Sequence, residues 1–328
     1  MIFINGIIIL KLKNLINIIE NLITFSNKII KEVKIMEKII LITGATDGIG
    51  KATAIALAKQ GNKVIVHGRN KEKTEKVVAE IKELTKNNNI DYVIADLFSL
   101  ESVRKMVEEI KENYTHLDVL INNAGAVFDV ERVETVDGVE RTLALNTISP
   151  TLLAELLVDH IAKSEEGRII YTVSEAHRMI PKVDINDINF ENEKDPQARY
   201  GKSKLFMIWL ARKQAKLLKE RGINNITVNV GHPGMVATNF GQNSNKGFLN
   251  NLIYGTMIVL YKMGIKLASS VEDGAKTTIY LATSNEVKRV TGKYFGNSKE
   301  EKPSEKYYSL ENEQRIWDYT MDKIRKYM

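Results

Sequence analysis

The sequence lacks cysteine entirely. This absence excludes disulfide bonds, cysteine metal sites and thiol nucleophiles. Histidine is scarce as well, and its five residues are too dispersed along the chain to show the spacing of metal ligands. We therefore predict that the protein holds no metal. The histidines are His67, His116, His160, His177 and His232.

Also missing are a linker rich in Pro, Gly or Ser and a patch of clustered positive charge. Hydrophobic residues make up 44% of the 328 residues, which is enough for one large core and predicts one main domain. The formal net charge is +6, but the 47 Lys and Arg residues are scattered and are not interleaved with aromatics. Nucleic acid is therefore not expected as a partner.

The N-terminal residues 1–35 lack an apolar run that could span a bilayer, because their longest uncharged run stops at Leu10. They also lack a convincing signal-peptide cleavage site. Apolar residues recur at helical spacing, and the lysines near the end of the segment suit a helix lying on a membrane surface. For the extension 1–36, three interpretations stay open: a translated upstream region before a start at Met36, an amphipathic helix in peripheral contact with a membrane, and a packing extension. A cytoplasmic location is expected, with membrane association if that helix is native.

Residues 37–328 alternate short β-branched runs with longer amphipathic stretches, the rhythm of repeated βαβ units. The runs are largely apolar and do not alternate with polar residues, as expected of parallel strands covered on both faces. The pattern predicts an α/β domain: a three-layer Rossmann fold with a doubly wound parallel sheet of about seven strands and helices on both faces. The strand candidates are residues 39–43, 63–68, 90–96, 118–125, 167–174 and 226–231.

Two segments break this rhythm. Residues 175–199 are polar and irregular, and residues 235–268 combine a Gly/Asn-rich start with an apolar stretch. Long interruptions after strands are where such sheets place substrate loops. We predict a substrate lid at about 235–268, although ordinary core packing explains its apolar stripe equally well.

The stretch TGATDGIGK, residues 43–51, carries glycines at 44, 48 and 50 between a strand and a helix that starts near Ile49. Gly44, Gly48 and Gly50 allow a sharp turn and a close approach of the backbone to a pyrophosphate, and the helix directs its first amides at the phosphates. The pattern predicts a dinucleotide site. Asp47 is interpreted as a helix cap, since a carboxylate would repel phosphate.

The second strand candidate ends in Gly68 and Arg69, at the place where a NAD-binding fold offers an acidic residue to the ribose hydroxyls. A guanidinium there forms charge-assisted bonds with a 2′-phosphate, each contributing roughly 1.5 to 3 kcal/mol. NADP(H) is therefore favoured over NAD(H). The alternative is that Arg69 is a solvated surface charge.

From about residue 37 to residue 296 the chain resembles the short-chain dehydrogenase/reductase family. The resemblance rests on a set of motifs in the family's order: TGATDGIG, Asp96-Leu97, NNAG at 122–125, Asn146, Ser174, YGKSK at 200–204 and HPG at 232–234. SEAH at 174–177, GHPGMVAT and GKYF are most similar to the retinol dehydrogenase-like branch, whose members act on apolar carbonyl compounds. That branch usually has a serine where this chain has Glu175, a carboxylate that either faces solvent or favours polar substrates.

Hydride transfer to a carbonyl leaves an alkoxide that needs a proton donor and a second hydrogen-bond donor. Tyr200 and Lys204 lie one helical turn apart and share a face. An ammonium about 4 Å from the phenol contributes roughly 4 kcal/mol at an effective dielectric near 20, which lowers the phenol pKa from ~10 by about three units. Tyr200 is thus the predicted proton donor and acceptor, and Ser174 is predicted to hold the substrate oxygen.

The resemblance also implies roles that residue chemistry alone does not supply. It implies that Lys204 bonds the nicotinamide ribose and that Asn146 positions a water that relays protons to Lys204. Further cofactor contacts are implied for Ile49, Asp96, Leu97, Asn123, Ala124, Gly125, Pro233, Gly234, Val236 and Thr238.

The predicted function is an NADP(H)-dependent oxidoreductase that interconverts an alcohol and its aldehyde or ketone, with a small, moderately apolar substrate. The alternative is a catalytically silent protein that binds NADP(H) for regulation. Family members often form dimers or tetramers, so a homo-oligomer is compatible with the resemblance.

Overall fold

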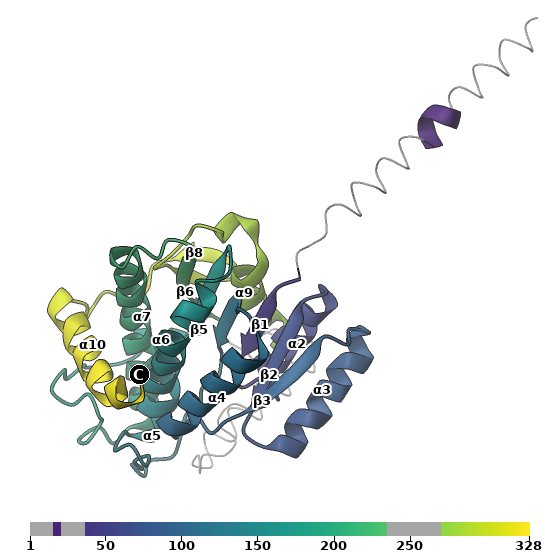
Figure 1. Ribbon diagram of the computed structural model, residues 1–328. Helices are drawn as coiled ribbons and strands as arrows, with labels where there is room; N and C mark the ends of the chain where they lie inside the picture. Colours follow the sequence, from purple (N-terminus) through teal and green to yellow (C-terminus); the bar gives the residue numbers. More distant parts are fainter. Residues whose placement is uncertain (1–15, 21–36, 235–269) are drawn as a thin grey trace, which may run out of the picture. The chain divides into compact units, whose positions relative to one another are not determined.

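The computed structural model describes residues 16–20, 37–234 and 270–328 (Figure 1). The chain divides into two units, Met1–Glu37 and Lys38–Met328. In the first unit, residues 16–20 are helical with exposed side chains. Among the described residues, no helix is long and apolar enough to cross a membrane. The predicted lid at 235–268 lies outside the described residues.

The second unit is built on one sheet of eight strands in the order β3-β2-β1-β4-β5-β6-β7-β8. Neighbouring strands are parallel through β7, and β8 pairs antiparallel with β7. The doubly wound parallel sheet is thereby confirmed, with one antiparallel edge strand added. The strands are β1 (Ile39–Ile42), β2 (Lys63–Gly68), β3 (Ile90–Ile94), β4 (Val119–Asn122), β5 (Gly167–Thr172), β6 (Ile226–His232), β7 (Tyr294–Gly296) and β8 (Lys299–Glu301).

Helices cover both faces of the sheet (Figure 1). The helices α2, α3 and α9 pack on one face, and α4, α6 and α7 pack on the other, with α10 outside α7. The helical elements are α2 (Gly48–Lys59), α3 (Lys71–Thr85), α4 (Leu100–Asn113), α5 (Arg141–Leu143), the π-helical η1 (Ala144–Ile148), α6 (Ser149–Ile161), η2 (Glu175–Arg178), α7 (Pro196–Glu220), α9 (Val271–Thr283), η3 (Asn285–Val287), α10 (Leu310–Ile324) and η4 (Arg325–Tyr327).

The two hydrophobic clusters show why the central strands carry apolar residues at consecutive positions. Leu41 belongs to the cluster under α4, α6 and α7, whereas its neighbours Ile40 and Ile42 belong to the cluster under α2, α3 and α9. Successive side chains of a strand point to opposite faces, so a sheet covered on both sides buries all of them.

Local capping sets where the site-bearing helices begin. Asp47 is the N-cap of α2, where its carboxylate accepts a hydrogen bond from the Gly48 amide at 2.8 Å. Asp195 caps α7 and accepts from the Gln197 amide, and Pro196 occupies the first helical position, which favours proline. This start places Tyr200 in the second turn of α7.

The strand order defines where a ligand can bind. The chain leaves β1 toward β2 and β3, and it leaves β4 in the opposite direction toward β5 and β6. In open parallel sheets of this kind, ligands bind at the carboxyl ends of the strands where the winding direction reverses. The switch lies between β1 and β4, whose carboxyl ends carry the glycine turn and the NNAG stretch.

Candidate active site

The glycine turn joins β1 to α2 in a conformation that only small residues tolerate. Gly44 and Gly48 have positive φ angles of 63° and 50°. A Cβ atom on Gly50 would lie 2.5 Å from the Asn123 Nδ2 atom, so this helix start packs directly on the NNAG stretch. The Asp47 carboxylate accepts from the Gly48 amide, and the next amides of this first helical turn have no acceptor within the helix, the arrangement that binds anions.

The NNAG stretch after β4 is fastened to the glycine turn by Thr43. The Thr43 Oγ1 atom accepts hydrogen bonds from the amides of Asn123 and Ala124, each at 3.0 Å. The Asn123 side chain donates in return to the Thr43 carbonyl at 2.9 Å. A Cβ atom on Gly44 would lie 3.0 Å from the Ala124 Cα atom. The two predicted cofactor loops therefore form one rigid unit.

Three of the predicted site residues meet just beyond the carboxyl end of β4: Gly125, Asn146 and Lys204. A Cβ atom on Gly125 would lie 2.7 Å from the Asn146 Oδ1 atom and 3.0 Å from the Lys204 Nζ atom. Asn146 is buried within the π-helical turn η1, and its side chain accepts from the Ala126 amide and donates to the Ala126 carbonyl. π-Helical turns occur frequently at functional sites.

Lys204 is buried, with 3% of its surface exposed. Its ammonium group donates to the Thr172 carbonyl at 2.9 Å. Burial lowers the pKa of Lys204 to about 7, because removing the charged form from water is costly. A lysine with such a pKa gains or loses its proton within the physiological range.

Tyr200 is also buried and lies beside Lys204, as the spacing on α7 predicted. The Lys204 Nζ atom is 5.7 Å from the centre of the Tyr200 ring. An ammonium on the same side of the ring favours the ionised form of the phenol.

Ser174 stands two residues beyond the end of β5 and is the N-cap of the short helix η2. Its Oγ atom accepts a hydrogen bond from the Ala176 amide at 3.2 Å. A hydroxyl that accepts in this way keeps its own hydrogen for another acceptor. Ser174 is therefore a helix cap, and this role leaves its hydroxyl hydrogen able to bond a substrate oxygen.

Glu175 stands where the family pattern has a serine, and its carboxylate is bonded to other side chains of the protein. Its carboxylate accepts a hydrogen bond from the Tyr294 hydroxyl and pairs with Arg178 at 2.7 Å. Burial alone would raise the pKa of Glu175, but the bonds from Tyr294 and Arg178 outweigh it and hold the pKa below its usual value. Its negative charge is therefore balanced locally by Arg178.

The predicted adenosine contacts lie at the ends of β2 and β3. Arg69 is exposed directly after β2, and it makes no hydrogen bond or ion pair with the described part of the chain. Asp96 is exposed after β3 and accepts from the Phe98 amide, whereas Leu97 is buried. Nearby, Lys73 pairs with Asp47 at 3.4 Å.

The HPG turn follows β6. Gly234 has a positive φ of 72°, and its amide donates to the His232 Nδ1 atom at 3.1 Å. Val236 and Thr238 lie outside the described residues. The His232 Nε2 atom lies 3.5 Å from Glu175 and 3.4 Å from Glu301, a set of groups with the spacing of metal ligands. Because Nδ1 accepts from an amide, neutral His232 carries its hydrogen on Nε2, so it faces the carboxylates as a donor.

Two supporting contacts were not predicted from the motifs. His67, a polar residue in an apolar strand, accepts from the Gly44 amide and donates to the Ala95 carbonyl, and burial lowers its pKa to about 4. Arg199, the residue before Tyr200, forms a fully buried ion pair with Glu140 at 3.3 Å. An apolar run interrupted by His67 is a detectable signal, but the partner of Arg199 is not evident from sequence.

The Arg199–Glu140 pair joins several segments around the site. Arg199 also donates to the carbonyls of Asp129 and Val130, in the loop after NNAG. Glu140 accepts from the Leu143 amide and thereby caps α5, the helix that leads into the turn of Asn146. The pair thus ties the helix of Tyr200 to the element that carries Asn146.

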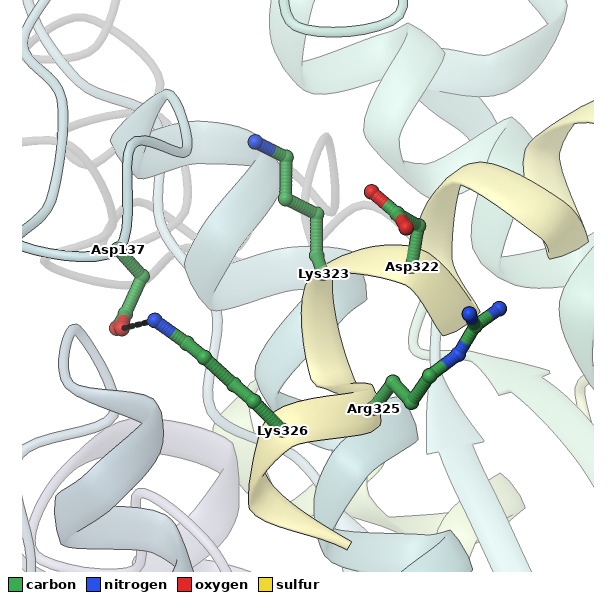
Figure 2. Close-up of a pocket in the computed structure, with 5 residues that line it drawn as sticks. All are labelled: Asp137, Asp322, Lys323, Arg325 and Lys326. Carbon is green, nitrogen blue, oxygen red and sulfur yellow. Dashed lines mark ion pairs between the residues drawn. The ribbon is translucent and has the colours of Figure 1, made fainter.

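A hollow of about 400 Å³ lies elsewhere, at the carboxyl end of α10 (Figure 2). Its basic side chains surround the end of a helix, where cations are favourable, and Lys326 pairs with Asp137 at 3.9 Å. It contains none of the predicted site residues. The lining residues are Asp137, Asp322, Lys323, Arg325 and Lys326.

A parallel sheet with a glycine turn at its switch point and a Tyr-Lys pair on α7 is typical of nucleotide-dependent oxidoreductases. Residues 38–248 match the family model described as short chain dehydrogenase. The chain belongs to the short-chain dehydrogenase/reductase family. It is therefore an oxidoreductase of the alcohol and carbonyl class with a nicotinamide cofactor.

The curated relatives confirm the resemblance to the retinol dehydrogenase-like branch. Human polyprenol dehydrogenase is 33% identical over 285 residues, which cover 86% of this chain and 83% of the relative. Human retinol dehydrogenase 13 is 33% identical over 284 residues, which cover 85% of this chain and 82% of the relative.

Solved structures confirm the fold. A crystal structure of a protein from Mycobacterium paratuberculosis superposes with a TM-score of 0.67 at 22% identity, covering 88% of this chain and 93% of the other. A short-chain dehydrogenase from Escherichia coli CFT073, complexed with NADPH, gives a TM-score of 0.60 at 23% identity, covering 80% of this chain and 97% of the other.

Proposed function

We propose that the protein is an NADP(H)-dependent oxidoreductase that interconverts an alcohol and its aldehyde or ketone, with Tyr200 as the proton donor and acceptor. The observation that carries the proposal is the buried Lys204 beside Tyr200, packed against Gly125 and Asn146 at the switch point of the sheet. The names of the relatives, polyprenol and retinol dehydrogenases, support a moderately apolar alcohol or carbonyl compound as the substrate.

The two glycine-containing loops meet at the switch point, where dinucleotides bind in folds of this kind. At Gly44, Gly50 and Gly125 a Cβ atom would collide with other protein groups, so glycine is what lets the two loops and Lys204 pack this closely. When bound, the nicotinamide supplies or accepts the hydride. The residues that would hold the cofactor are Gly44, Gly48, Ile49, Gly50, Asp96, Leu97, Asn123, Ala124, Gly125, Tyr200, Lys204, Pro233 and Gly234.

Tyr200 gives its phenolic proton to the substrate oxygen in reduction and takes it back in oxidation. The charged form of Lys204 stabilises the phenolate, and a pKa of about 7 means that this charge is only partly present before the anionic cofactor arrives. A negative charge bound close to Lys204 would favour its ammonium form.

Ser174 and Asn146 complete the assignment. The Ser174 hydroxyl donates to the substrate oxygen while its own oxygen accepts from the Ala176 amide. The Asn146 side chain makes two hydrogen bonds to Ala126, which fix the π-helical turn, and the Asn146 backbone in that turn is the group proposed to position a relay water toward Lys204.

NADP(H) is the proposed cofactor because Arg69 presents an exposed guanidinium at the end of β2 that no protein group neutralises within the described residues. A carboxylate at this place would bond the ribose of NAD(H) and repel a 2′-phosphate. A cation has the opposite preference.

The test is NADPH oxidation over a panel of aldehydes, ketones and quinones, with wild type, Tyr200→Phe and Tyr92→Phe. Tyr92 is the matched control, since its hydroxyl bonds Glu75 away from the predicted site. We expect turnover by wild type and the control, and a loss of roughly 10²-fold or more in kcat for Tyr200→Phe. A protein that binds NADPH but reduces no compound, with an unchanged Tyr200→Phe variant, would instead be a nucleotide-binding protein.

A further inference from the structure

The turn that follows Ser174 is held by a histidine with both ring nitrogens engaged. The His177 Nδ1 atom donates to the Ser174 carbonyl at 2.7 Å, and the Nε2 atom accepts from the Ser304 amide at 3.0 Å. An amide can only donate, so Nε2 is the acceptor and Nδ1 carries the hydrogen. The contacts therefore fix one tautomer of the neutral ring.

The surroundings of His177 favour the neutral ring over the charged one. Only 1% of its surface is exposed. Burial lowers the pKa of His177, and the bond to the Ser174 carbonyl offsets only part of that effect. A neutral, fully bonded imidazole without contact to solvent is not arranged as an acid or a base. It is arranged as a rigid spacer between two backbone groups.

Further contacts tie the same turn to the same distant segment. Glu175 accepts from the Tyr294 hydroxyl of β7, and Arg178 donates to the Lys302 carbonyl at 2.6 Å. Residues 175, 177 and 178 thus all bond to residues between Tyr294 and Ser304. The turn is anchored along its whole length to a part of the chain more than a hundred residues later.

The turn also packs directly on the helix of Tyr200. A Cβ atom on Gly201 would lie 2.8 Å from the Ala176 carbonyl oxygen, so glycine is required at the point of contact. The Ala176 amide is the group that bonds the Ser174 Oγ atom. Any shift of the turn therefore moves the serine hydroxyl relative to Tyr200.

We propose that His177 is a positioning residue for Ser174: its Nδ1 bond to the Ser174 carbonyl sets the direction of the serine hydroxyl, and the Ser304 amide at Nε2 holds the ring in the tautomer that donates this bond. The inference rests on the proposed function, in which that hydroxyl holds the substrate oxygen. A displacement of about 1 Å in a reacting geometry costs on the order of a hundredfold in rate. His177 acts through backbone contacts and touches neither substrate nor cofactor.

Three substitutions test the two hydrogen bonds of the His177 ring one at a time. In His177→Asn the amide nitrogen takes the place of Nδ1 and restores the bond to Ser174. In His177→Gln the longer side chain reaches the place of Nε2 and restores only the bond to Ser304. His177→Ala restores neither. His160→Ala is the matched control, because His160 is likewise buried, with 2% of its surface exposed, but lies on α6.

We expect His177→Asn to stay within about threefold of the wild-type kcat, and His177→Ala and His177→Gln to lose roughly ten- to a hundredfold. The substrate KM and the NADPH Kd should not change, and the control should keep its kcat. Equal losses in the three variants, or a fully active His177→Ala that binds NADPH, would overturn the proposal. An equal loss in the control would assign the effect to packing.

A second measurement does not depend on turnover. In ¹⁵N-labelled protein, the His177 ring should carry its hydrogen on Nδ1 between about pH 6 and 8, because both ring nitrogens are bonded. A hydrogen on Nε2 would overturn the proposal even in an active enzyme. If wild type instead shows the Nδ1 hydrogen but reduces no compound, the proposed function fails, and the positioning role that rests on it fails with it.

Discussion

Lys204→Met should stabilise the protein while it abolishes activity. The pKa of Lys204 falls from 10.5 to about 7 on folding, since burial penalises the ammonium. At 1.36 kcal/mol per pH unit, this shift costs about 5 kcal/mol of folding free energy at any pH well below 7. Losing the bond to the Thr172 carbonyl returns roughly 1 to 3 kcal/mol of that gain. The variant should therefore be about 2 to 4 kcal/mol more stable at pH 6.

The sign of the pH dependence gives a sharper test. Between pH 7 and 10.5 the unfolded chain binds more protons at Lys204 than the folded protein, so wild-type stability rises with pH over that window. The advantage of Lys204→Met should then shrink by about 3 kcal/mol between pH 7 and 9.5. Urea unfolding of the cofactor-free protein, followed by the fluorescence of the buried Trp209, measures both stabilities.

Lys216→Met is the control, since Lys216 lies on the same helix with 64% of its side chain exposed. It should follow the wild-type pH dependence. A Lys204→Met variant that is less stable than wild type at pH 6, or whose stability runs parallel to wild type up to pH 9.5, would refute the reasoning. Either result would mean that the buried amine keeps its proton at little cost.

Three further outcomes are expected. Arg69→Ala should weaken NADPH binding by roughly ten- to a hundredfold and leave NADH binding unchanged, as measured by fluorescence titration; an unaltered preference would make Arg69 a surface charge. Glu140→Gln should lower the free energy of unfolding by about 3 to 5 kcal/mol, because it leaves the Arg199 guanidinium buried without a counter-charge, and an unchanged urea midpoint would contradict this. Elemental analysis of chelator-washed protein should find no stoichiometric metal. If a metal is found and His232→Ala removes it, the His232 Nε2 atom is a metal ligand and not the hydrogen-bond donor inferred above.

Local patterns predicted much of the fold and of the site. The strand runs, the glycine turn, the Asp47 cap and the placement of Lys204 one turn after Tyr200 depend on neighbours within a few residues, so the sequence contains the whole signal. The assignment of residues 37–328 to a single domain stays a prediction. The role of the extension 1–36 stays a prediction, which mass spectrometry of the native N-terminus tests.

What the sequence did not reveal depends on distant partners. Glu175 had two open interpretations until its carboxylate was found bonded to Tyr294, 119 residues later. The Arg199–Glu140 pair spans 59 residues, and neither residue stands in a recognisable motif. The burial of Lys204, which lowers its pKa to about 7, is likewise not evident from the spacing of Tyr200 and Lys204 on a helix.

The attachment of the serine turn to residues 294–304 has a consequence for synthesis of the chain. The glycine turn and the NNAG stretch lie before residue 126, so the nucleotide-binding half can acquire its contacts while translation continues. Ser304, by contrast, lies 127 residues after His177. The serine turn should therefore reach its final position only after the last strands have emerged from the ribosome, and full reactivity should await nearly complete synthesis of the chain.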